Sequence, residues 1–206
     1  MTSDVVVFPD PPFNMLISGI TGCGKTHYVL DLLETKFRNK FDYIIIICPT
    51  INYNRTYGRK FLQSDPHVYV LAINGKLDEI LNALITVFKD PTEQTLFIID
   101  DCANLYDTKL KATALTALAF HGRHFNLSTW VITQKYNAII KDFRENIRVL
   151  VLFYDKDRES REAAFKENDI GMSTDEKDRV IQTLKTEKNS KLIMQLFQPF
   201  KYAVLS

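Results

Sequence analysis

The sequence predicts an α/β fold in which helices flank a mainly parallel central sheet. Short apolar runs rich in Ile, Val and Phe alternate with stretches whose apolar residues recur at helical spacing, and this alternation is typical of βαβ units. The chain has 206 residues, of which 46% are hydrophobic, so it can bury one sizeable core. We therefore expect a single domain over residues 1–206.

Local patterns predict the individual elements. Polar residues or glycine flank the apolar runs, which we expect to form strands at Asn14–Ser18, Tyr43–Cys48, Val68–Ala72, Thr95–Ile99, Thr129–Thr133 and Val149–Phe153. Helical spacing predicts helices at Lys25–Lys36, Lys76–Phe88, Lys109–His121, Tyr136–Glu145 and Arg158–Glu167.

The C-terminal part continues with a helix and two strand-like runs. Ser173 and Glu176 have the spacing of a capping box ahead of an apolar run, which predicts a helix start. Leu192–Phe197 and Tyr202–Leu205 are joined near Pro199, a pattern that suits an edge hairpin.

Charge and hydropathy exclude several classes of function. Lys and Arg number 26 against 25 Asp and Glu, so no global charge attracts nucleic acid or a membrane. The longest apolar run, Tyr43–Cys48, is far below the ~20 residues that span a bilayer, and the N-terminus has no secretion-signal pattern. The three widely spaced cysteines suggest reduced thiols in an intracellular compartment.

A phosphate-binding motif follows the first predicted strand. Gly19-Ile20-Thr21-Gly22-Cys23-Gly24-Lys25-Thr26 matches G-x-x-x-x-G-K-[ST] and opens the first predicted helix, which is the context that a P-loop requires. A glycine-rich turn without a ligand is the weaker alternative, because both flanks fit. We expect ATP to be bound by Gly19, Thr21, Gly22, Cys23, Gly24, Lys25, Thr26 and His27, with Lys25 at the β- and γ-phosphates and only the backbone of Cys23 involved.

Acidic and amide side chains follow two later strands. Asp100 and Asp101 end the run Thr95–Ile99, where a P-loop site needs an acid, so Thr26 and Asp100 are expected to hold Mg²⁺. Asp101 would polarise the attacking water, although two solvated acids are the alternative. Gln134, after the run Thr129–Thr133, could sense the γ-phosphate or be a buried amide satisfied by backbone.

These motifs resemble those of the FtsK/HerA-type ATPases. The order and spacing of Gly19–Thr26, Phe97–Cys102, His121–His124 and Thr133-Gln134 are most similar to the genome-packaging ATPases of poxviruses, other large DNA viruses, virophages and polintons. The resemblance covers about residues 13–165, the expected core, and leaves about 166–206 as a C-terminal extension. It implies a sheet of the additional-strand type, in which the strand ending at Gln134 lies between the P-loop strand and the Asp100 strand.

The resemblance also implies a function and partners. It implies an ATP-hydrolysing, homo-oligomeric ring that drives double-stranded DNA into a viral capsid at the capsid or portal vertex, with no membrane partner. Such a protein would act in the host-cell cytoplasm or a viral factory, or in association with the virion. Asp101 stands where the wider superfamily usually has glutamate, so its carboxylate is one methylene shorter.

Other residues carry expectations about a neighbouring subunit and DNA. At least one of Arg123, Arg144 and Arg148 is expected to complete a neighbour's site in trans, while for each alone a surface arginine is the alternative. Tyr53, Arg55, Tyr57, Arg59 and Lys60 interleave aromatic and cationic side chains, which suits DNA contact, although an ordinary exposed loop fits equally well.

Three other enzyme classes share the P-loop. A nucleoside or nucleotide kinase fits the length, but Asp101 and Gln134 suit attack by water and no arginine-rich lid segment is evident. A GTPase-type switch would carry an N-K-x-D pattern that reads guanine, and Thr133–Tyr136 does not match this pattern. A non-packaging DNA translocase or helicase-like ATPase remains an alternative.

Overall fold

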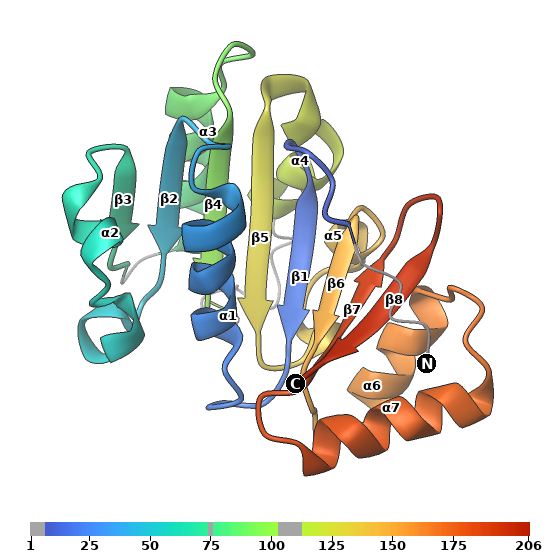
Figure 1. Cartoon of the computed structure of the whole chain (residues 1–206). Helices are drawn as coiled ribbons and strands as arrows, with labels where there is room; N and C mark the ends of the chain where they lie inside the picture. Colours follow the sequence, from blue (N-terminus) through green and yellow to red (C-terminus); the bar gives the residue numbers. More distant parts are fainter. Residues whose placement is uncertain (1–6, 74–75, 103–112) are drawn as a thin grey trace.

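The computed structural model describes residues 7–73, 76–102 and 113–206. These residues form an eight-stranded sheet in the order β3-β2-β4-β5-β1-β6-β7-β8 (Figure 1). The strands are β1 (Asn14–Ser18), β2 (Tyr43–Ile47), β3 (Val68–Leu71), β4 (Thr95–Asp100), β5 (Leu127–Thr133), β6 (Val149–Leu152), β7 (Lys191–Gln195) and β8 (Lys201–Leu205).

The order of the strands confirms the predicted fold class. Strands β1 to β6 pair in parallel, and β5 lies between β1 and β4 as the additional strand. Ser18 is in register with Thr133, and Ile132 with Asp100. The carboxyl ends of β1, β4 and β5 therefore meet at one edge of the sheet, where open α/β sheets bind their ligands.

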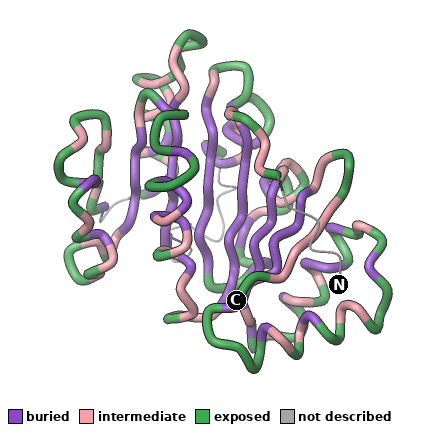
Figure 2. Tube along the Cα trace, in the orientation of Figure 1, coloured by how far each residue is buried: buried purple, intermediate pink, exposed green. Residues whose placement is uncertain are grey.

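Helices cover both faces of this sheet. They are α1 (Lys25–Leu32), α2 (Lys60–Ser64), α3 (Leu77–Phe88), α4 (Thr113–His121), α5 (Lys141–Arg144), α6 (Arg158–Glu167) and α7 (Thr174–Thr186), with a π-helical turn at Leu33–Phe37 continuing α1. One core cluster packs α1 and α2 against one face of the sheet. A second cluster packs the helices from α3 through α7 against the opposite face. The central strands are buried along their length (Figure 2), as parallel strands covered on both faces must be.

Two helix predictions need correction. The predicted helix Tyr136–Glu145 is wrong as one element, because a 3-10 turn (Tyr136–Ala138) and α5 are separated by extended backbone at Ile139 and Ile140. Side chains replace the helical backbone hydrogen bonds that are missing at this break. Ser160 Oγ accepts from the Tyr136 amide, and Arg144 Nε donates to the Ile139 carbonyl. The helix predicted at Lys109–His121 is seen from Thr113, because residues 109–112 lie outside the described part.

The C-terminal predictions are confirmed. Ser173 and Glu176 form the reciprocal capping box of α7. Strands β7 and β8 pair antiparallel as an edge hairpin, with β7 also antiparallel to β6. Over residues 7–73, 76–102 and 113–206, no helix has the length and apolar character needed to cross a membrane.

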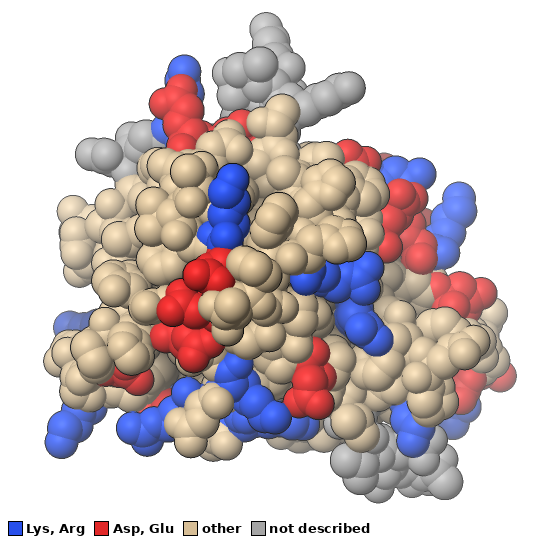
Figure 3. All heavy atoms as spheres, turned by 90° about the horizontal axis from the view of Figure 1, so that it is seen from above, with Lys and Arg blue, Asp and Glu red and all other residues tan. Residues whose placement is uncertain are grey.

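Surface charge is mixed on the edge opposite the strand carboxyl ends. Figure 3 views the molecule from above, onto the edge where the central strands begin, and shows cationic and anionic side chains interspersed. The described residues therefore form no continuous basic surface on this face.

Candidate nucleotide site

The P-loop connects β1 to α1 at the carboxyl edge of the sheet (Figure 1). Gly24 is the N-cap of α1 and has a φ of 97°, a left-handed conformation that favours glycine. Gly19 sits so close to the end of β6 that an added Cβ would lie 2.5 Å from the Cβ of Phe153, the residue after that strand. These glycines let the loop curl around a small anion, and the start of α1 adds unpaired backbone N–H groups.

Lys25 lies inside the loop. Its side chain is largely buried, and Nζ donates to the carbonyls of Gly19 at 2.6 Å and Ile20 at 2.9 Å. The loop thus holds the ammonium group beside the P-loop backbone. This is the position from which a lysine can reach an anion held by that backbone.

The carboxylate of Asp100 meets the P-loop at Thr26. Thr26 Oγ1 donates to Asp100 Oδ2 at 2.8 Å, and the hydroxyl of Tyr57 donates to the same oxygen at 2.5 Å. Burial raises the pKa of Asp100, while the hydrogen bonds from Tyr57 and Thr26 act in the opposite direction. Hydroxyl and carboxylate oxygens side by side at a cavity wall fit a Mg²⁺ ion, which prefers oxygen ligands.

Asp101 and Gln134 face one another across β4 and β5. Gln134 Nε2 donates to Asp101 Oδ1 at 3.0 Å. Asp101 has a φ of 53°, a left-handed conformation that costs most residues energy and that Asp and Asn tolerate better than most. The backbone turn at Asp101 separates its side chain from that of Asp100, and the two acids have different partners.

An open cavity of about 530 Å³ joins these groups. Lys25, Thr26, Asp100, Asp101 and Gln134 all line it. Thr21, Gly22, Gly24 and His27 line it as well, so most of the predicted phosphate-binding residues share one space. The cavity is large enough for a nucleotide's phosphates, and charged and polar side chains from the P-loop, β4 and the end of β5 line it.

The segment after β2 forms one wall of this cavity. The sequence did not predict that this segment belongs to the nucleotide site. Thr50, Tyr53, Asn54, Arg55 and Thr56 line the cavity beside the two acids. Arg55 is exposed and makes no ion pair within the described residues. It therefore adds a cation opposite the P-loop wall.

Two of the residues expected to contact DNA are engaged elsewhere, so that expectation is wrong for Tyr57 and Arg59. Tyr57 is buried, with its hydroxyl on Asp100. Arg59 is mostly buried and pairs with Asp31 at 2.7 Å and Glu34 at 2.5 Å. Tyr53, Arg55 and Lys60 remain exposed.

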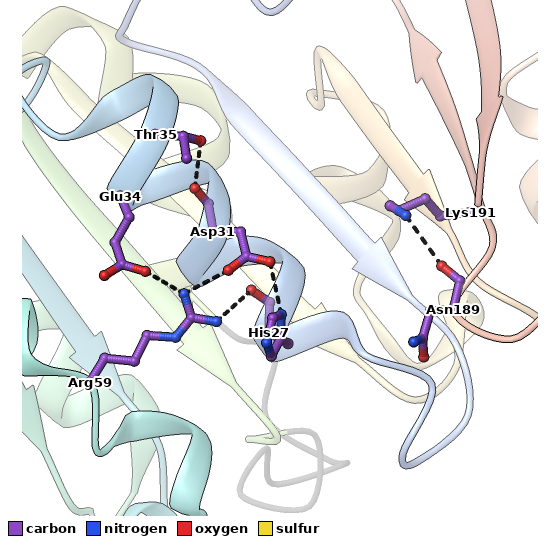
Figure 4. A network of polar contacts seen from close by, with 7 residues as sticks. All are labelled: His27, Asp31, Glu34, Thr35, Arg59, Asn189 and Lys191. Atoms are coloured by element: carbon purple, nitrogen blue, oxygen red, sulfur yellow. Dashed lines mark hydrogen bonds and ion pairs between the residues drawn. The ribbon is translucent and has the colours of Figure 1, made fainter.

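Arg59 connects this segment to the P-loop helix. Figure 4 shows its guanidinium reaching Asp31, Glu34 and the carbonyl of His27, while His27 Nδ1 contacts Asp31. The figure also shows Asn189 and Lys191 on the other side of the P-loop. An added Cβ on Gly24 would lie 3.3 Å from Asn189 Oδ1, so the turn before β7 closes the loop from that side.

The three arginines predicted to act in trans lie away from this cavity. Arg123 is exposed in the 3-10 turn Gly122–Phe125, which precedes β5, and Arg148 directly precedes β6. Both are therefore at the amino edge of the sheet. Arg148 stacks on Phe197 at 4.6 Å. Arg144 is largely buried, pairs with Glu167 and stacks on Tyr136.

A family model described as the poxvirus A32 protein matches residues 7–198 of the chain. The chain belongs to the poxvirus A32 protein family. The resemblance to poxvirus-type proteins inferred from the motifs is thereby confirmed. Two curated relatives agree with it: the DNA packaging protein OPG160 of variola virus, in two versions, is 29% identical over 145 residues, which is 66% of this chain and 51% of the relative. This A32-family chain spans about half the length of the curated relatives it matches.

Solved structures share the fold of this A32-family chain. The DNA-packaging ATPase B204 of Sulfolobus turreted icosahedral virus superposes with a TM-score of 0.71 at 16% identity, over 96% of this chain and 98% of B204. B204 of Sulfolobus turreted icosahedral virus 2, in complex with ATP-gammaS, gives 0.69 at 17% identity, over 94% and 97%. The pCW3 conjugation coupling protein TcpA gives 0.62 at 13% identity, over 94% and 60%.

Proposed function

We propose that this chain is an ATP-hydrolysing motor that moves double-stranded DNA into a viral capsid. The observation that carries the proposal is the convergence of Lys25, Thr26, Asp100, Asp101 and Gln134 on one cavity. Membership of the A32 family, a relative named as a DNA packaging protein and a shared fold with a packaging ATPase support the proposed biological role.

The proposed chemistry is attack of water on the γ-phosphate of ATP. The P-loop amides and Lys25 hold the β- and γ-phosphates, and Thr26 with Asp100 would hold Mg²⁺. The ion supplies positive charge to the phosphate oxygens when bound. Asp101 accepts a proton from the attacking water, and Gln134, which contacts Asp101, orients that water or the γ-phosphate. The products are ADP and inorganic phosphate.

The proposed DNA contact is local and independent of sequence. The net charge of the chain is only +1, so binding must rely on a few phosphate contacts and weaken with salt. Exposed Tyr53 and Lys60 remain candidates for such contacts at the rim.

The proposed active species is a homo-oligomeric ring. Subunits that associate head to tail and close by rotation bring one subunit's surface beside the next subunit's site. Arg123 and Arg148 lie at the edge opposite the P-loop, where such a neighbour would be reached, and a trans arginine contributes ~10³ to 10⁵ in rate. Arg144 fits this role less well because Glu167 and Tyr136 already bind it.

A mixing experiment tests the trans arginine. A Lys25→Ala chain, dead in its own site but with intact arginines, is titrated into chains carrying Arg123→Ala, Arg144→Ala or Arg148→Ala. We expect activity to be restored at mixed interfaces for the arginine that acts in trans. If every arginine variant is fully active alone, or none is rescued, the assignment fails.

The enzymatic part of the proposal is tested with long duplex DNA. We expect Mg²⁺-dependent ATP hydrolysis that duplex DNA stimulates, and no transfer of phosphate to nucleosides or nucleotides. Transfer to a nucleoside would instead identify a kinase. Hydrolysis without any response to DNA would remove the motor function while leaving an ATPase.

A further inference from the structure

The buried acid at the proposed metal site has a partner besides the P-loop threonine. Tyr57 is 7% exposed, and its hydroxyl lies 2.5 Å from Asp100 Oδ2. Thr26 Oγ1 contacts the same oxygen at 2.8 Å. A tyrosine 43 positions away in the sequence is thus aimed at the acid that ends β4.

The backbone around Tyr57 is fixed on both sides. On the N-terminal side, Asn54 caps the 3-10 turn Arg55–Tyr57, with its Oδ1 accepting from the Thr56 amide at 3.1 Å. On the C-terminal side, Arg59 is bound to Asp31 and Glu34 of the P-loop helix region (Figure 4). The ring itself packs in the core cluster that also holds Phe61 and Leu62.

This arrangement fixes the direction of the Tyr57 hydroxyl. The ring is held by packing, and the flanking residues are held by hydrogen bonds and ion pairs, so the O–H group points at Asp100. Charge-assisted hydrogen bonds of this kind are about twice as strong as neutral ones and fix geometry. Side chains that orient a metal-binding carboxylate in this way control how well the ion is bound.

We propose that Tyr57 is a positioning residue of the metal site, whose hydroxyl fixes the Asp100 carboxylate against Thr26. This inference rests on the proposed nucleotide site. The Thr26 hydroxyl would also be a ligand for the ion, whereas Tyr57 would act on the ion through the acid. Without Tyr57, the carboxylate keeps a single hydrogen bond and can rotate away from the cavity.

The test replaces the hydroxyl while keeping the ring. Binding of a fluorescent ATP analogue is measured in EDTA and as a function of Mg²⁺ concentration for wild type and Tyr57→Phe. We expect unchanged affinity in EDTA and a half-saturating Mg²⁺ concentration raised about tenfold or more, because a hydrogen bond to a charged group is lost. The turnover number at saturating Mg²⁺ should fall much less than the Mg²⁺ affinity.

Tyr136→Phe is the matched control. Tyr136 is also buried and donates to the carboxylate of Glu167 at 2.9 Å, and neither residue lines the cavity. This variant should lose stability like Tyr57→Phe but keep the wild-type Mg²⁺ dependence. Equal Mg²⁺ shifts in both variants would show a general effect of lost stability and overturn the proposal.

A second comparison asks whether Tyr57 acts through Asp100. In an Asp100→Asn background, Tyr57→Phe should add no further change in Mg²⁺ dependence, since coupled residues are not additive. Additive effects overturn the proposal, and so does a wild-type Mg²⁺ requirement in Tyr57→Phe.

A label that keeps the hydroxyl covers the case in which Tyr57→Phe does not fold. With 3-fluorotyrosine placed at position 57 alone, the ¹⁹F signal should move when Mg²⁺ is added to the nucleotide-bound chain. A signal that does not move contradicts the proposal. A wild-type chain that binds no ATP analogue at all would instead refute the proposed nucleotide site.

Discussion

Replacing Asp101 by Asn separates catalysis from binding. The left-handed backbone at Asp101, with a φ of 53°, is adopted by Asn as readily as by Asp. The amide has the same shape as the carboxylate. Its Oδ1 can still accept the hydrogen bond from Gln134 Nε2, which is 3.0 Å long in the wild-type chain. The folding cost should therefore stay within about 0.5 kcal/mol. The change removes the negative charge and, with it, the group that can accept a proton from water.

The expected loss of activity follows from that role. General base catalysis contributes about 10²- to 10⁴-fold, which is about 2.7 to 5.4 kcal/mol of barrier at about 1.36 kcal/mol per tenfold. The turnover number should fall by this factor. Affinity for an ATP analogue should persist, because the proposed phosphate contacts come from Lys25 and the P-loop backbone.

The assay compares steady-state phosphate release with equilibrium binding of a fluorescent ATP analogue. Asp178→Asn is the control, because it removes the same charge from an exposed position on α7. A normal rate in Asp101→Asn would place the base elsewhere. Loss of nucleotide binding would refute the argument that Asp101 acts only on water.

Three further results are expected. Lys25→Ala should abolish hydrolysis and weaken ATP binding, measured in the same two assays, because it removes the cation beside the P-loop carbonyls; retained turnover would contradict the site. Arg55→Ala should lower the basal ATPase rate, whereas Lys60→Ala should spare it, because Arg55 lines the cavity and Lys60 does not; equal effects would remove Arg55 from the site. Hydrogen bonds from Ser173 and Tyr202 lower the pKa of Glu176 from 4.5 to about 2. The ionised Glu176 therefore stabilises the fold fully above pH 4.5, and this contribution is lost as the pH falls toward 2. In acid titrations of unfolding free energy, the gap between wild type and Glu176→Gln should close over that range, and a constant gap would contradict it.

The sheet could be predicted because its signals are local. Each buried strand is a continuous apolar run, and the P-loop and the Asp100-Asp101 pair mark the ends of two of them. The break in the helix predicted at Tyr136–Glu145 could not be foreseen, because it depends on the side chains of Ser160 and Arg144, which form hydrogen bonds with the backbone there. Spacing within one segment carries no information about such partners.

The site was predictable in its P-loop half and not in its other wall. Tyr53, Arg55, Tyr57 and Arg59 form one alternating pattern of aromatic and cationic residues, but the fold gives them different roles. Tyr57 points inward to Asp100, and Arg59 finds acids on the first helix, whereas Tyr53 and Arg55 face the cavity. Tertiary contacts made this distinction, and they join segments far apart in the chain.

Triplex displacement tests the central claim, ATP-driven movement along DNA, most directly. A third strand is annealed to one end of a long linear duplex, and its release by the full chain is followed over time with ATP and Mg²⁺. The account predicts release that requires hydrolysable ATP, weakens as salt rises and is absent in Lys25→Ala and Asp101→Asn. ATP hydrolysis stimulated by the same DNA without release of the third strand, or equal release by Lys25→Ala, would contradict the claim that this chain is a DNA-translocating motor.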